Sequence, residues 1–310
     1  MTEPGPPATA APTAPAPAEL SADPAIRRTL RVFGSVVAPA TLLTALLYYF
    51  GWTATHASAS YLGIDESLLS FSTQDYLLRS VNAVFWPLSV GLIAAALAIY
   101  GHNSVMRHIR HPGPRFRIRW LIGALALISV VAATYGALAL HYDWVSRGNF
   151  SVAPLSLTLG VALFTYAVLI HELATAHAKK APPTSSGGSG SLVAVAMALL
   201  IAVGLFWQVA EWATAVGVGR TRNLINNLDA QPSVALFSAK RLALAGPDGV
   251  TETAVAGTDG AYRYRYTGLR LLFRSGGKYL LLAEHWTRAD GRTFIIDDTA
   301  DLRLEFSPDQ

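Results

Sequence analysis

His171, Glu172 and His177 are the residues whose types come nearest to a catalytic metal site. A zinc protease places its second histidine four residues after the first, so that both imidazoles share one face of a helix. Thr175 stands at that position here, and the second histidine comes two residues later. Six residues turn a helix by about 240°, so the two rings would diverge. We therefore expect no zinc site, and the lack of cysteine excludes disulfides and thiolate metal sites.

A strictly alternating run, Tyr262-Arg263-Tyr264-Arg265-Tyr266, is a candidate outer binding face. In a strand, a period of two places the tyrosines on one side and the arginines on the other. Such a strand can offer a stacking and cationic surface to a polyanion or a sugar polymer. The alternative, which we favour, is an ordinary half-buried strand with one solvated face.

A second group of cations is a cluster of arginines between two long apolar runs. Its members are Arg107, Arg110, Arg115, Arg117 and Arg119. Arginines next to a membrane span attract the headgroups of anionic lipids. The plainer interpretation is that they only fix the side of the membrane on which this loop lies.

Carboxylates and a histidine offer the remaining acid–base chemistry. Glu284, His285 and Asp297 lie in the C-terminal part of the chain, and Asp65 and Glu66 lie in an earlier loop. An enzyme acting on lipid or cell-wall material would need several of them in one cleft.

The elements that must position these residues are mostly apolar. Apolar residues make up 52% of the 310 residues and charged residues 14%, against about 25% charged in an ordinary soluble domain. Five runs are each about as long as a helix that crosses a bilayer: residues 32–52, 81–101, 120–140, 152–171 and 192–212. Their central parts carry no charge, which argues against ion-coupled transport.

The basic residues of the connecting segments predict an orientation. Three arginines precede the first run, five lie in the loop before the third, and Lys179 and Lys180 follow the fourth. The opposite short loops hold only Arg79 and Arg147. The positive-inside rule then places the N-terminus in the cytoplasm and the C-terminus outside the membrane.

The segments outside the apolar runs differ in character. Residues 1–25 are rich in proline and alanine, which predicts a disordered cytoplasmic tail. Residues 53–80 form an unusually apolar outer loop, in which Ser72 and Asp75 are spaced as a capping box. We expect a short helix in this loop, lying on the outer surface or packed as a cap on the spans or on the C-terminal domain.

The C-terminal segment 213–310 is nearly balanced in charge and has the pattern of a small all-β domain. Turn residues separate short alternating segments. The expected strands are 233–237, 241–244, 262–266, 269–274, 279–282, 293–296 and 302–306, with a hairpin about Gly276-Gly277.

Two stretches resemble a group of uncharacterised multi-pass membrane proteins of actinobacteria. One runs from Tyr61-Leu62-Gly63-Ile64-Asp65 through Ser72-Thr73-Gln74-Asp75-Tyr76-Leu77-Leu78-Arg79-Ser80. The other runs from Tyr264-Arg265-Tyr266-Thr267-Gly268-Leu269-Arg270-Leu271-Leu272 through Gly276-Gly277-Lys278-Tyr279. The resemblance implies a protein of the bacterial plasma membrane and supplies no catalytic residue.

The sequence therefore predicts five transmembrane helices, over 26–212, followed by a small extracytoplasmic β domain. We expect a non-catalytic envelope sensor, binding module or assembly module. The alternatives are a membrane-embedded enzyme and an accessory subunit of a transporter. The expected partners are the lipid bilayer and a membrane or envelope protein. No cofactor and no nucleic acid are expected.

Overall fold

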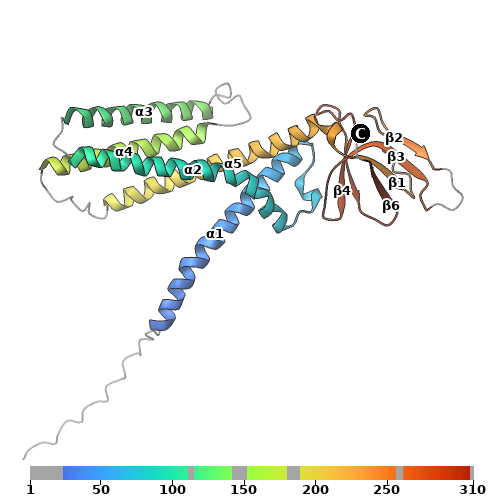
Figure 1. The fold of residues 1–310 in the computed structure, drawn as a ribbon, viewed down its shortest axis with the longest axis horizontal. Helices are drawn as coiled ribbons and strands as arrows, with labels where there is room; N and C mark the ends of the chain where they lie inside the picture. The colour runs from blue at the N-terminus through green and yellow to red at the C-terminus, as the bar shows by residue number, and fades with distance from the viewer. Residues whose placement is uncertain (1–23, 111–114, 142–151, 180–188, 256–260, 308–310) are drawn as a thin grey trace, which may run out of the picture. The chain divides into compact units, whose positions relative to one another are not determined.

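The computed structural model describes residues 24–110, 115–141, 152–179, 189–255 and 261–307. In this part of the chain five long helices precede an antiparallel sheet (Figure 1). The helices are α1 (Pro24–Tyr61), α2 (Thr73–Arg110), α3 (Arg115–His141), α4 (Ala153–Lys179) and α5 (Ser189–Asn226), with short 3-10 helices η1 (Glu66–Leu69) and η2 (Leu228–Ala230). The strands are β1 (Ser233–Ser238), β2 (Thr251–Ala254), β3 (Tyr264–Ser275), β4 (Lys278–Ala283), β5 (Thr293–Asp297) and β6 (Leu302–Ser307).

All five helices are long and apolar enough to cross a membrane. Their large apolar side chains stay exposed: Leu92 and Leu97 on α2 are 64% and 66% exposed, and Leu199 on α5 is 61% exposed. Water would make such surfaces costly, whereas lipid accepts them. The predicted fold class of apolar helices followed by a β domain is confirmed at this level.

Three helices extend well beyond the predicted spans. α1, α2 and α5 each have 38 residues, or about 57 Å at 1.5 Å per residue. Most of the expected outer loop 53–80 is therefore helical, and only residues 62–72 separate α1 from α2. The predicted tail 1–25 lies outside the described residues up to residue 23, and α1 begins at Pro24.

The chain divides into two compact units, Met1–Thr44 and Ala45–Gln310. The contacts discussed below all lie in the second unit. There α3 packs along α4, α4 contacts α5, and α5 contacts α2. Small residues allow these approaches: the hydroxyl of Ser129 on α3 donates to the carbonyl of Gly160 on α4, and Gly204 on α5 lies against Thr158 on α4.

The sheet has the strand order β5-β4-β3-β1-β6, and β2 also pairs with β3. The predicted hairpin is the β3–β4 turn, where Gly276 and Gly277 both have positive φ. The expected strands 262–266 and 269–274 form one strand, β3, which begins at Tyr264 and continues through Gly268. Gly268 has φ 76°, and its close approach to the carbonyl of Gly249 leaves no room for a side chain.

The strand expected over 241–244 is wrong, and β2 at Thr251–Ala254 was missed. Ala243 has φ 53°, a left-handed conformation that a residue with a Cβ rarely adopts and that interrupts an extended strand. The amide of Leu242 donates to the Tyr266 hydroxyl over 2.7 Å. A side chain thus satisfies a backbone donor that a neighbouring strand would otherwise satisfy.

The sheet has a buried cluster on each side. One cluster is internal to the β domain and includes Leu236, Tyr266 and Leu281. The other cluster joins the sheet to the helix ends, and we call it the docking core. Its buried members are Ala59, Leu62, Leu69, Leu228, Leu280, Leu282 and Trp286. The β domain is therefore packed onto the helices through a shared core.

Candidate functional site

The C-terminal parts of α1 and α5 lie in direct backbone contact. A Cβ on Gly217 of α5 would meet the carbonyl oxygen of Ala54 at 2.1 Å, so only glycine fits there. The hydroxyl of Ser58 on α1 donates to the carbonyl of Gly217 over 3.0 Å. These contacts hold the two helix ends together where they extend beyond the predicted spans.

The segment 62–72 then turns onto the β domain. α1 ends at Tyr61, and Gly63, whose φ is 74°, follows as a left-handed residue whose amide donates to the carbonyl of Ser60. At the other end, Ser72 and Asp75 exchange hydrogen bonds at the start of α2, so the predicted capping box is confirmed. The short helix η1 between them begins after Asp65, which accepts a hydrogen bond from the Ser67 amide.

Contacts far apart in sequence hold this segment against the sheet. Lys278 donates to the carbonyl of Leu68 over 3.0 Å, and Thr293 donates to the carbonyl of Leu62 over 3.3 Å. Leu69 is 3% exposed, within the docking core. Of the two placements that we considered for this loop, the cap packed on the C-terminal domain is the one present.

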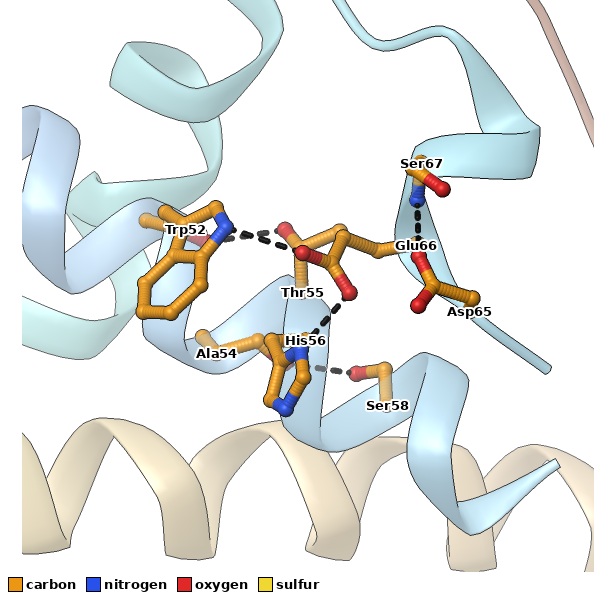
Figure 2. A network of polar contacts seen from close by, with 9 residues as sticks. Trp52, Ala54, Thr55, His56, Ser58, Asp65, Glu66 and Ser67 are labelled. Carbon is orange, nitrogen blue, oxygen red and sulfur yellow. Dashed lines mark hydrogen bonds and ion pairs between the residues drawn. The ribbon is translucent and has the colours of Figure 1, made fainter. Parts of the chain in front are cut away.

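A polar network lies beneath η1 (Figure 2). One oxygen of Glu66 lies 2.6 Å from Nδ1 of His56, and the other accepts a hydrogen bond from Nε1 of Trp52 over 3.0 Å. Burial acts to raise the pKa of Glu66, but the hydrogen bonds from His56 and Trp52 outweigh it and hold the pKa below its ordinary value. Glu66 is therefore ionised at neutral pH and orients His56, and Figure 2 shows the other ring nitrogen pointing away from this carboxylate.

His56 lines an open groove of about 480 Å³ between α1, α5 and the turn after β4, which we call the arginine groove. Its lining residues are Tyr49, Trp52, Thr53, His56, Ala57, Ser60 and Tyr61 of α1, Thr214, Val218 and Arg222 of α5, and Arg288. The guanidinium carbons of Arg222 and Arg288 lie 5.9 Å and 4.7 Å from the centre of the Tyr61 ring. Within the described residues neither arginine has an ion-pair partner. The groove thus carries two positive charges that are in no ion pair, and they lie against an aromatic wall.

A second, smaller pocket of about 170 Å³ lies on the other side of the α1–α5 contact. Arg79 and Arg220 line it, together with apolar side chains of the docking core. The guanidinium of Arg79 lies 4.3 Å from the centre of the Phe71 ring, and Phe71 in turn contacts Phe273. Its volume is about a third of that of the arginine groove, so the arginine groove is the better candidate for a ligand.

The alternating tyrosines do not line either pocket. Tyr266 is fully buried, Tyr262 and Tyr264 are half-buried, and Arg263 and Arg265 are exposed. The tyrosine side therefore packs toward the sheet core, and the arginine side faces solvent. This is the arrangement of a half-buried strand.

The arginines of the loop between α2 and α3 lie at the ends of these helices. Arg107 and Arg119 are exposed. The side chains of Arg110, Arg115 and Arg117 lie outside the described residues.

The carboxylates weighed for an enzyme do not gather in one cleft. Asp65 caps η1, and Glu66 contacts His56. Glu284 accepts a hydrogen bond from Arg270 over 2.7 Å, and Asp297 is exposed at the end of β5. His285, which is exposed, lies beside Gly249. Among the residues that the structure describes, no three His, Asp or Glu side chains are grouped to hold a metal.

Sequence reasoning missed the arginine groove, although one signal was present. Trp52, His56 and Ser60 recur every four residues on α1, and Thr214, Val218 and Arg222 recur likewise on α5. This spacing places each set on one helix face beyond the apolar run. No pattern pointed to Arg288, which joins the groove through the fold of the β domain.

No protein-family model, no curated protein and no solved structure matches this chain.

Proposed function

We propose that this protein is a non-catalytic membrane receptor that binds an anionic ligand in the arginine groove. The observation that carries the proposal is the pair of guanidinium groups of Arg222 and Arg288, which lie near one Tyr61 ring and, within the described residues, form no ion pair. Uncompensated arginines that line a groove favour an anion with oxygen acceptors. The rings of Tyr61 and Trp52 supply apolar walls for the rest of such a ligand.

The proposal also assigns a role to the β domain. Arg288 belongs to that domain, whereas Arg222 belongs to α5, so a ligand that contacts both bridges the helix ends and the sheet. The docking core already joins these parts. Ligand binding would therefore stabilise one placement of the outer domain, which is what a sensor or an assembly module requires.

The charge distribution along the chain supports an outward-facing β domain in a bacterial plasma membrane. Arg107 lies near the end of α2 and Arg119 near the start of α3, so both lie at the opposite end of α2 from segment 62–72, which contacts the sheet. By the positive-inside rule this loop is cytoplasmic, together with the N-terminus. The groove and the sheet then lie on the extracytoplasmic side.

The test is the mass of the intact protein purified from its native membrane in a mild detergent. We expect the wild type to retain a small molecule that an Arg222→Gln/Arg288→Gln double variant loses. Arg263→Gln is the matched control, because Arg263 is exposed just before β3 and lies outside the groove. Equal masses for the wild type and the double variant would contradict the proposal.

One observation favours the enzyme as a second candidate function. Glu66 orients His56, and Ser60 lines the same groove four residues further along α1. A carboxylate, an imidazole and a hydroxyl are the components of a hydrolase that acts through a serine nucleophile. This candidate predicts turnover of native lipid extract that Ser60→Ala abolishes, whereas the receptor predicts a bound ligand that stays chemically unchanged.

A further inference from the structure

We infer that the ligand of the arginine groove is the phosphate headgroup of an anionic membrane lipid. The inference rests on the proposed function and names the class of its ligand. It follows from three features: the height of the groove above the apolar runs, the order of apolar and cationic side chains along it, and the binding groups left free in it.

The groove begins at the last turn of the first apolar run, with Tyr49 and Trp52, and continues beyond the end of the last run. Thr214, Val218 and Arg222 follow the end of the last apolar run, Trp212, by two, six and ten residues. At 1.5 Å per residue they lie about 3, 9 and 15 Å beyond it along the helix axis. The headgroup region of a leaflet is roughly 5–8 Å thick, so the groove covers that region and opens just above it.

The side chains change from apolar to cationic along the same direction. Tyr49 and Ala57 line the groove on α1, and Val218 lines it on α5. The two arginines are Arg222, further along α5, and Arg288 of the β domain. Helical side chains lean toward the N-terminus of their helix. Because α5 runs outward from the apolar run, the Arg222 side chain leans back toward the membrane. A lipid with its chains in the bilayer would therefore present its phosphate to the arginines.

The groups left free in the groove suit a phosphate. The hydroxyls of Thr53 and Thr214 are already engaged, because they donate to carbonyls of their own helices over 2.8 Å and 3.1 Å. The free groups are therefore the guanidinium groups and one nitrogen of His56. The two guanidinium groups have no ion pair within the described part of the chain, and His56 keeps one ring nitrogen free of Glu66. Glu66, the carboxylate that contacts His56, is already bonded to His56 and Trp52. The groove therefore offers donors and positive charge to an anion.

The experiment measures binding of defined lipids to the full chain in detergent by native mass spectrometry. The probes are phosphatidylglycerol, which is anionic, and phosphatidylcholine, which is zwitterionic; inorganic phosphate is the soluble competitor. We expect phosphatidylglycerol to bind in preference to phosphatidylcholine. Loss of a charge-assisted hydrogen bond should weaken that binding by at least about ten-fold in Arg222→Gln and in Arg288→Gln.

Arg220→Gln is the matched control. Arg220 is exposed on the same helix, two residues before Arg222, and it lines the other pocket. Its variant should bind phosphatidylglycerol within two-fold of the wild type. Equal losses in Arg220→Gln and Arg222→Gln would overturn the inference, because they would indicate a diffuse attraction to positive charge.

The other outcomes separate this inference from the proposed function. Inorganic phosphate that binds at the two groove arginines while phosphatidylglycerol does not would overturn the lipid and leave the anion receptor standing. A native ligand without phosphate that the double variant loses would do the same. Retention of the same mass by wild type and double variant from native membranes would overturn both.

Discussion

Truncation of Leu69 tests whether the docking core holds the β domain on the helices. Leu69 is 3% exposed and packs with Leu280 and Leu282 of β4. Leu69→Ala removes three carbon atoms, or about 2.4 kcal/mol at 0.8 kcal/mol per methylene, and the remaining cavity brings the expected cost to about 3 kcal/mol. The neighbouring Leu68 is 47% exposed, so Leu68→Ala should cost less than about 1 kcal/mol.

The assay uses the absence of native cysteine, since a single introduced thiol is the only one in the chain. Ala59, 2% exposed in the docking core, is replaced by cysteine, and its rate of reaction with a thiol reagent is measured. If the segment must undock before the thiol reacts, about 3 kcal/mol corresponds to labelling on the order of 100-fold faster in Leu69→Ala. Leu68→Ala should change the rate by less than five-fold.

A second reporter distinguishes undocking from unfolding of the sheet. Ala283 is fully buried in the other cluster, internal to the β domain. A cysteine at this position should stay protected in Leu69→Ala. Equal labelling of Ala59→Cys in Leu69→Ala and in Leu68→Ala would refute the reasoning, because the docking core would then contribute nothing to the placement of the domain.

Three further changes should have measurable effects. Gly217→Val should lower the free energy of unfolding in detergent by about 1–3 kcal/mol, seen as a lower melting temperature, because the valine side chain collides with the α1 backbone. Gly219→Val should have little effect, because a Cβ at Gly219 meets nothing. Arg270→Met should cost about 3 kcal/mol in denaturant titrations followed by near-ultraviolet circular dichroism, because it removes a buried guanidinium that bonds two carbonyls and a carboxylate. The hydrogen bonds from Arg292 hold the pKa of Asp248 below its ordinary value, so the unfolded chain binds this proton more readily and stability falls as the pH drops below about 4. Asp248→Asn should be less stable at neutral pH and should lose that part of the acid dependence; an unchanged pH profile of unfolding would contradict the assignment.

The helices could be predicted from the sequence because length and hydropathy decide them locally. Each of the five apolar runs falls within one helix, to within one residue at Val152. The ends of α1 and α5 were not predicted, because their polar faces resemble a loop when the partner helix is unknown. Their stability comes from contacts such as that of Gly217 with Ala54, which no local pattern reveals.

The β domain shows where local patterns stop being informative. Alternation and turn residues predicted β1, β4, β5 and β6 to within one or two residues. Residues 241–244 alternate equally well, yet Ala243 adopts a left-handed conformation and Leu242 is bonded to a tyrosine hydroxyl. The arginine groove could not be predicted for a related reason, since Tyr61 and Arg288 meet only after the sheet has packed on the helix ends.

The connections between segment 62–72 and the sheet constrain the order of assembly. Thr293 bonds to Leu62 across 231 positions of the chain, and Lys278 bonds to Leu68 across 210. During synthesis segment 62–72 therefore leaves the ribosome long before the strands that cover it. Leu69 stays exposed until β4, which carries Leu280 and Leu282, has been synthesised. Folding of this region is complete only when strands β4 and β5 have packed on segment 62–72, so a chain that lacks these strands would leave Leu69 exposed to quality-control proteases.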